Sequence, residues 1–171
     1  MADNVSGATA PPGNGAADQQ QLIVNAQYIK DLSFENPRAP HSLLQQKDPP
    51  EVQLGVDVKA QGLGPDVYEV MLTIAASAKH AGETVFVAEL TYAAVVTLRN
   101  ATQEMIPILI LVEAPRLLFP FARAIIATAT REGGFPPLLI HPVDFAELLR
   151  RQQAQAAGAG AGAAPGGTAT A

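Results

Sequence analysis

Four segments in the first hundred residues alternate apolar and polar positions with a period of two. In residues 51–58, Val52, Leu54, Val56 and Val58 alternate with polar or small neighbours. Residues 22–35, 67–76 and 84–98 follow the same pattern. A period of two is typical of a β-strand with one buried and one wet face. The sequence therefore predicts four strands.

The alternation also predicts which side chains share a face. In residues 22–35 the apolar face carries Leu22, Val24, Ala26, Tyr28, Leu32 and Phe34, and the polar face carries Asn25, Gln27, Asp31, Ser33 and Glu35. In residues 84–98, Phe86 lies on the apolar face, whereas Val87 and Glu89 lie on the opposite one. We expect the two polar faces to turn away from the core.

The links between strands predict an antiparallel sheet, and helices follow it. Residues 62–66 and 79–83 are short and turn-rich, which favours hairpins. After residue 99 the alternation ends. Thr102 is a candidate N-cap for a helix reaching about Glu113, or starting one turn later because of Pro107.

Two further helices complete the prediction. Pro115 ends the first helix, and a second covers residues 116–131, with Pro120 near its first turn and Gly133-Gly134 as its stop. Asp144 caps the last helix, with Glu147 three residues on. Strands first and helices second predict an α+β fold, a four-stranded antiparallel sheet with helices packed on one face.

Composition divides the chain into one domain and two tails. Residues 1–21 and 152–171 are rich in Ala and Gly and poor in apolar bulk, so we expect both to be disordered, which leaves residues 22–151 as one domain. The first tail has no Lys or Arg and resembles no secretory signal.

Charges and prolines interrupt residues 105–130 before they reach the length of a membrane span. There is no cysteine, so we expect a soluble, cytoplasmic protein without direct membrane insertion.

The charge balance argues against nucleic acid as a partner. The formal net charge is −5, and the excess of acidic residues lies in the first hundred residues. Phosphate binding needs a basic face, and the sequence offers none.

Candidate chemistry is sparse. His41 and His141 lie next to Pro40 and Pro142, and His80 lies in a predicted turn, so none is expected on a helix that could form a metal site. No nucleophile, metal or phosphate-loop motif occurs. Asp31 and Glu35 face outward, where burial does not separate their pKa values for acid–base work. We therefore expect no enzyme activity, catalytic residue, metal or cofactor.

Two patterns point to binding, each with a plainer alternative. Asp31, Glu35, Val87 and Glu89 are predicted to form an acidic surface with an apolar spot, and the alternative is a solvated sheet face. The helical half is strongly apolar, which indicates an oligomer interface or exposed apolar grooves, or else a well-filled core.

Six runs in register resemble the SecB family of bacterial protein-export chaperones. They are YIKDLSFENPRAP (residues 28–40), PPEVQL (49–54), DVYEV (66–70), GETVFVAEL (82–90), LFPFAR (118–123) and GFPPLLIHPVDF (134–145). Together they span most of the predicted domain in the family's order. A single run carries little information, whereas six in order are specific.

The resemblance implies an ATP-independent holding chaperone. Members of the family bind unfolded secretory precursor proteins, keep them competent for translocation and deliver them to the SecA motor. It also implies a homotetramer, a dimer of dimers whose dimers meet through the helix near residues 102–113.

The resemblance further assigns residues to partners. Asp31, Glu35, Val87 and Glu89 correspond to the family's SecA-binding surface. Phe34, Phe86 and Tyr68 are the candidate client-binding side chains. No nucleotide or metal is implied.

The sequence leaves two other classes of function open. One is a small α+β enzyme or ligand-binding module with a pocket between sheet and helices. The other is a SecB-like fold used as an antitoxin-linked chaperone with one dedicated client.

Overall fold

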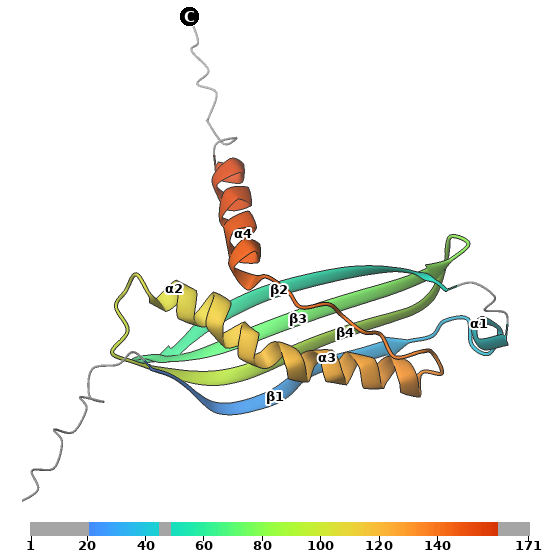
Figure 1. Cartoon of the computed structure of the whole chain (residues 1–171), viewed down its shortest axis with the longest axis horizontal. Coiled ribbons are helices and arrows are strands. Elements are labelled where there is room, and N and C mark those ends of the chain that lie inside the picture. The colour runs from blue at the N-terminus through green and yellow to red at the C-terminus, as the bar shows by residue number, and fades with distance from the viewer. Residues whose placement is uncertain (1–20, 45–48, 161–171) are drawn as a thin grey trace, which may run out of the picture.

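A four-stranded antiparallel sheet with a long helix across one face forms the body of the protein. The computed structural model describes residues 21–44 and 49–160. Its elements are β1 (Gln21–Glu35), α1 (His41–Leu44), β2 (Glu51–Gly64), β3 (Val67–His80), β4 (Glu83–Arg99), α2 (Ile106–Ile108), a π-helical turn η1 (Leu109–Glu113), α3 (Ala114–Glu132) and α4 (Phe145–Gly160). The strand order is β1-β4-β3-β2, and every neighbouring pair is antiparallel (Figure 1). The predicted fold class is confirmed.

The pleat of the two central strands sorts apolar from polar side chains. On β3 and β4 most even-numbered residues are buried beneath the helices, and Leu72, Ile74 and Leu90 are fully buried. From α3, Leu118 and Ile126 fill the same core. The odd-numbered residues face the other side of the sheet, which we call the open face.

The edge strand β1 departs from the predicted alternation. Its register against β4 shifts twice, between Val24 and Ala26 and again between Ile29 and Asp31. Each shift adds a residue and reverses which parity faces the helices. Ala26 and Tyr28 were predicted on the apolar face, and this assignment is wrong because they lie between the two shifts and turn to the open face. The second shift restores the predicted parity for Leu32 and Phe34.

The first helical segment starts later and runs further than predicted. Thr102 is not its N-cap; the helix begins at Ile106, with Pro107 in its first turn. Pro115 does not end it, because the π-helical turn η1 comes directly before, and the chain continues into α3 (Figure 1). The wider turn leaves room for a proline ring that would clash with a carbonyl in a regular α-helix. Pro120 lies well inside α3.

The end of α3 follows the predicted glycine stop. The Gly134 amide donates to the Arg131 carbonyl (3.0 Å) and the Phe135 amide donates to the Thr130 carbonyl (3.1 Å). Gly134 has φ +89°, the left-handed conformation that this type of helix end requires. The turn directs Phe135 back into the core, where it is buried.

The last helix is capped as predicted but is longer. The Glu147 amide donates to Asp144 Oδ1 (3.0 Å). The helix continues to Gly160, so residues 152–160, predicted to belong to a disordered tail, are helical. Alanine and glutamine favour helix, and Gln152 donates a hydrogen bond to Asp57 of β2 (2.7 Å). The remainder of the two predicted tails lies outside the described residues, apart from Gln21, where β1 begins.

No helix in the described part of the chain has both the length and the apolar character needed to cross a membrane. The longest apolar helix, α3, instead places its buried side chains against the sheet. The same helix leaves Leu117 and Phe121 about half exposed. These two side chains form part of the apolar surface considered below.

Candidate functional site

The predicted acidic residues come together on the open face. Ser33 pairs with Glu89 and Glu35 pairs with Val87 across β1 and β4, and Asp31 lies opposite Thr91. Asp31, Glu35 and Glu89 are all exposed. We call these three residues the acidic patch. Val87, half-buried, adds the predicted apolar spot at one end of the patch, opposite Glu35.

A shallow depression adjoins the acidic patch. Its volume is about 270 Å³, and it lies across β2, β3 and β4. Gly55, Ala75 and Ser77 line it with small side chains, and Val87 and Glu89 belong to the same lining. The acidic patch therefore borders a surface that a partner's side chain can enter.

A buried carboxylate lies on the same open face. Glu69 of β3 is only 4 % exposed. Lys30 Nζ lies 2.8 and 2.9 Å from its two carboxylate oxygens, Gln61 Nε2 donates to Oε2, and the Tyr28 hydroxyl donates to Oε1. We call Tyr28, Lys30, Gln61 and Glu69 the Glu69 cluster. It joins β1, β2 and β3 across the surface of β4.

The Glu69 cluster shifts two pKa values in opposite directions. The Lys30 ammonium, followed by the Tyr28 hydroxyl, holds the pKa of Glu69 below its ordinary value, although burial opposes this. The hydrogen bond to Glu69 raises the pKa of Tyr28, with burial adding to the effect. The cluster is therefore most stable with an ionised Glu69 and a neutral Tyr28.

Two of the three candidate client-binding side chains meet on the helix face. The rings of Phe34 and Phe86 are stacked with centroids 5.7 Å apart, and Phe135 lies 5.0 Å from Phe86. We call Phe34, Phe86 and Phe135 the aromatic cluster. Phe86 is only 3 % exposed, so it lies behind Phe34 rather than at the surface.

Tyr68 does not join the aromatic cluster. It pairs with Val96 of β4, whereas Phe86 pairs with Ala78 of the same strand β3. Ten residues of β3 separate the two positions, about 33 Å of extended chain. Tyr68 packs against the opposite end of the core.

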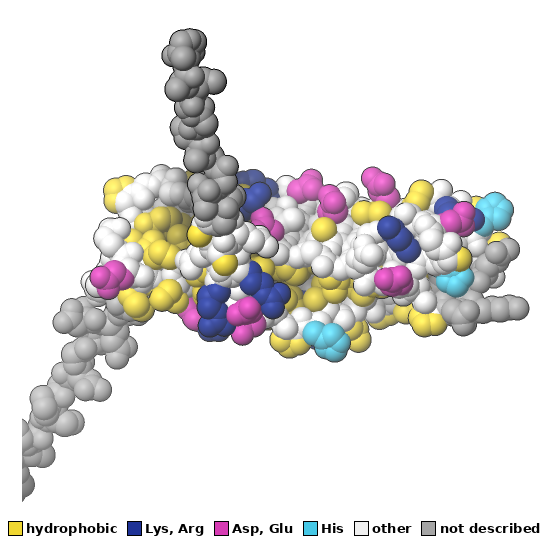
Figure 2. Space-filling view, turned by 90° about the horizontal axis from the view of Figure 1, so that it is seen from above, with side chains coloured by type: hydrophobic (Ala, Val, Ile, Leu, Met, Phe, Trp, Pro, Cys, Tyr) yellow, Lys and Arg dark blue, Asp and Glu magenta, His cyan; other side chains and the backbone are white. Residues whose placement is uncertain are grey.

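An apolar groove follows the edge of the sheet next to the aromatic cluster. Ile29 and Leu32 of β1 form one wall, and Ala124, Ile125, Thr128 and Ala129 of α3 form the other. Its volume is about 390 Å³. Ile29 is 47 % and Leu32 42 % exposed, which is high for large apolar side chains. Figure 2, from another side, also shows apolar side chains reaching the surface between interspersed charges.

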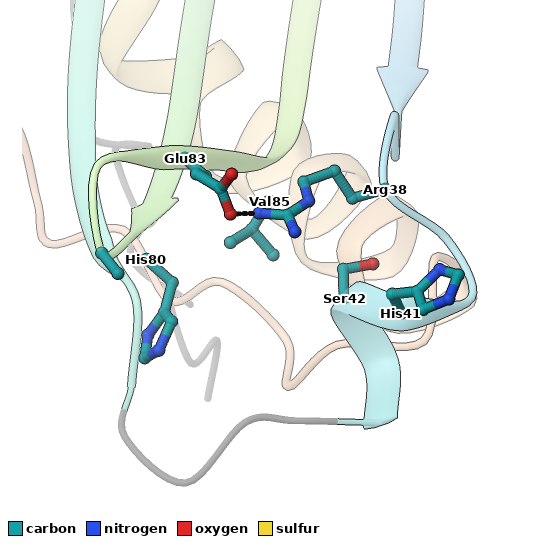
Figure 3. A pocket seen from close by; sticks show the side chains of 7 residues that line it. Arg38, His41, Ser42, His80, Glu83 and Val85 are labelled. Carbon is teal, nitrogen blue, oxygen red and sulfur yellow. Dashed lines mark ion pairs between the residues drawn. The ribbon is translucent and has the colours of Figure 1, made fainter.

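A third hollow lies where the β3–β4 hairpin meets α1. Arg38 forms an ion pair with Glu83, and the rest of the lining is His41, Ser42, His80, Ala81 and Val85 (Figure 3). The two imidazole rings point away from each other in this view. Among the described residues no three His, Asp or Glu side chains are grouped closely enough to hold a metal ion.

The sequence did not indicate the role of Phe135 or the Glu69 cluster, and it indicated exposed apolar grooves in the helical half without the β1 wall of this groove. The Gly-Gly-Phe sequence after α3 was the available signal for Phe135, because a helix end of this type places an apolar residue against the helix. The groove and the cluster depend on the two register shifts in β1, which alternation alone does not reveal.

Comparison with known proteins gives one consistent family. The family model "Preprotein translocase subunit SecB" matches residues 15–156. The "Protein-export protein SecB" of Rhodospirillum centenum is 49 % identical over 151 residues, covering 84 % of this chain and 90 % of that protein. That of Bradyrhizobium diazoefficiens is 51 % identical over 143 residues, covering 81 % and 89 %.

A solved structure has a similar fold. The SecB-like chaperone Rv1957 of Mycobacterium tuberculosis, in complex with a ChAD peptide from the HigA1 antitoxin, superposes with a TM-score of 0.60. The match covers 71 % of this chain and 90 % of that one, at 15 % identity. At this identity the likeness concerns the fold.

The contact between Phe34 and Gly133 gives a first prediction. A Cβ added at Gly133 would lie 2.2 Å from Phe34 Cζ, so Gly133→Ala must displace a ring held by the aromatic cluster. Overpacking of this kind costs about 1–3 kcal/mol of unfolding free energy, measurable by urea denaturation. Gly62→Ala, where a Cβ meets nothing within 4 Å, is the control and is expected to leave stability nearly unchanged. Equal stability of the two variants would contradict the contact.

The Glu69 cluster gives a pH prediction. Because the folded state lowers the pKa of Glu69, ionisation of Glu69 adds stability above the ordinary glutamate pKa of about 4.3. This contribution is lost as the pH falls through the folded-state value. We expect the melting temperature of Glu69→Gln to fall less steeply below about pH 4.3 than that of the unsubstituted protein. Parallel pH profiles would refute this.

Proposed function

The chain belongs to the SecB family, and on that premise we propose that it is a holding chaperone for protein export. It binds unfolded secretory precursors without ATP, keeps them competent for translocation and delivers them to the SecA motor. The observation that carries the proposal is the presence of two chemically different surfaces on opposite faces of one sheet. The apolar groove and aromatic cluster lie on the helix face, and the acidic patch lies on the open face.

The apolar groove has the chemistry of a surface for unfolded chains. An unfolded precursor exposes apolar side chains, each worth about 1.5–3 kcal/mol when fully buried. Micromolar affinity needs roughly 8 kcal/mol beyond the costs of association, so one groove binds weakly. Ile29, Leu32 and Phe34 are the side chains of β1 that we place against the client, with Phe86 and Phe135 supporting Phe34. Tyr68 is a separate and more distant client contact.

Repetition of the groove would overcome this weakness. We propose a homotetramer, a dimer of dimers, in which several grooves hold one client and raise the effective concentration for each further contact. The outer side chains Leu117 and Phe121 of α3 and Ile108 of α2, all exposed in the single chain, support an additional contact between copies. The first helical segment, now bounded by Ile106 and Glu113, remains the proposed contact between dimers.

The acidic patch fits a basic partner. Asp31, Glu35 and Glu89 present three carboxylates, half-buried Val87 adjoins them at one end, and the neighbouring depression adds room for a side chain. We assign this surface to SecA. Since the sheet separates it from the apolar groove, the motor can dock while the client remains bound. The proposed chaperone is cytoplasmic, and its action requires neither nucleotide nor metal.

A mass measurement tests the chaperone function. Size-exclusion chromatography with light scattering is expected to give about four protomers of 17.8 kDa, and an increase when a slow-folding, chemically unfolded precursor is added. The native form of the same precursor is the control and leaves the mass unchanged. A monomer or dimer that ignores the unfolded chain would refute the proposal.

Charge reversal tests the separation of the two surfaces. Glu89→Lys, alone or with Asp31→Lys, is expected to weaken SecA binding about tenfold or more, because like charges then face each other. Glu132→Lys, the same change at an exposed residue outside both the acidic patch and the proposed contact between dimers, is the matched control. Client binding stays constant in all variants. Loss of both activities in a variant of unchanged mass would show that the two surfaces are not independent.

A further inference from the structure

The Glu69 cluster places a buried charge on the face of the sheet that is remote from the core. Burial of a carboxylate is costly unless it is paired and hydrogen-bonded, and Glu69 has Lys30, Tyr28 and Gln61 as donors. Lys30 and Tyr28 belong to β1, which is not adjacent to β3 in the sheet. Both side chains therefore cross β4, where the position opposite Tyr28 is the small residue Ala93.

The second register shift of β1 brings Lys30 next to the acidic patch. Tyr28 pairs with Ala93 and Asp31 with Thr91, both on the open face. Lys30 also lies on the open face, since its ammonium contacts Glu69. In a regular strand, Lys30 and Asp31 would point to opposite faces. Here a cation and a carboxylate of the acidic patch are neighbours in sequence and share a face.

The Lys30 ammonium is nevertheless drawn away from Asp31. It lies 2.8 Å from the Glu69 carboxylate and 3.4 Å from Met71 Sδ. Thr73 is the β3 residue in line with Thr91 and Asp31, so Glu69 lies four residues further along β3, about 13 Å at 3.3 Å per residue. This is a spacing along the strand between the two positions, and the Lys30 ammonium, which contacts Glu69 and Met71, lies on the Glu69 side of it. The Lys30 charge is thus engaged by Glu69 and forms no ion pair with a carboxylate of the acidic patch.

We propose that Glu69 is a positioning residue for partner binding: by holding the Lys30 ammonium at the Glu69 cluster, it prevents this cation from pairing with Asp31 and preserves the negative charge of the acidic patch. The inference rests on the proposed SecA contact at the acidic patch. It assigns a partner-binding role to a residue that lies outside the contact surface. The second register shift of β1 makes this role necessary, because it places Lys30 and Asp31 on the same face, and Glu69 then keeps their charges apart.

The test is a charge rescue measured with purified SecA. Glu69→Gln keeps the shape of the side chain and an acceptor for Tyr28 but releases Lys30. We expect SecA binding, measured by isothermal titration calorimetry, to weaken about threefold to tenfold, more at low salt than at high salt. The double variant Glu69→Gln/Lys30→Gln removes both charges and is expected to restore the affinity to within about twofold. Client binding is expected to stay constant throughout.

The double variant distinguishes an effect of the Lys30 charge on SecA binding from an effect of Glu69 on folding. If Glu69 only supported the sheet, the double variant would bind SecA as weakly as the single one, and the proposal would be overturned. An unchanged affinity of Glu69→Gln would also overturn it. Lys30→Gln alone gives a second measurement should Glu69→Gln fail to fold: it is expected to bind SecA within about twofold of the unsubstituted protein. A marked gain in affinity would show that Lys30 already neutralises the acidic patch, which would also overturn the proposal.

Glu89→Lys, measured in the same series, distinguishes a failure of the proposed SecA contact from a failure of the proposed role of Glu69. If Glu89→Lys binds SecA normally, the acidic patch is not the contact and the proposed function fails at that surface. If Glu89→Lys loses binding while Glu69→Gln does not, the contact stands and only the role of Glu69 is rejected.

Discussion

The pleat of one β-sheet governs the arrangement of both candidate surfaces. Side chains of successive strand residues point to opposite faces, so a single strand can supply apolar groups to one side and carboxylates to the other. β1 does this most clearly, with Leu32 and Phe34 on the helix face and Asp31 and Glu35 on the open face. Two ligands of opposite chemistry can then be held by the same few residues without competing for space.

The central strands show how far alternation predicts structure. β3 and β4 follow a period of two except for one register shift next to their hairpin, because both faces and both neighbours of these strands are fixed by the sheet. β1 is an edge strand paired on one side only, and it accommodates two extra residues. Such irregularities have no composition signal in Leu22–Phe34, so the faces of Ala26 and Tyr28 were predicted wrongly. Likewise, no sequence rule anticipated a π-helical turn that lets Pro115 continue a helix.

The candidate sites, too, were predictable from the sequence only in part. The face of Asp31, Glu35, Val87 and Glu89 agrees with the predicted alternation, because the second register shift restores the predicted parity and residues 31–35 then pair with β4 without interruption. The position of Tyr68 could not follow from it, since alternation gives the face of a residue but not its distance from Phe86 along the sheet. The Glu69 cluster was equally hidden, because its members come from three strands and meet only after the sheet order is known.

The irregular edge of the sheet also explains why charge and apolar surface stay separate. Between its two register shifts, β1 turns Tyr28 and Lys30 to the open face and Ile29 to the apolar groove. Without the second shift, Leu32 and Phe34 would face solvent on the acidic side, and Asp31 and Glu35 would be buried against α3. A buried, unpaired carboxylate costs far more than the exposed groove gains, so the second shift is a requirement of the fold. The shift also places a lysine beside Asp31, and the buried carboxylate of Glu69 is the nearby group that holds this lysine.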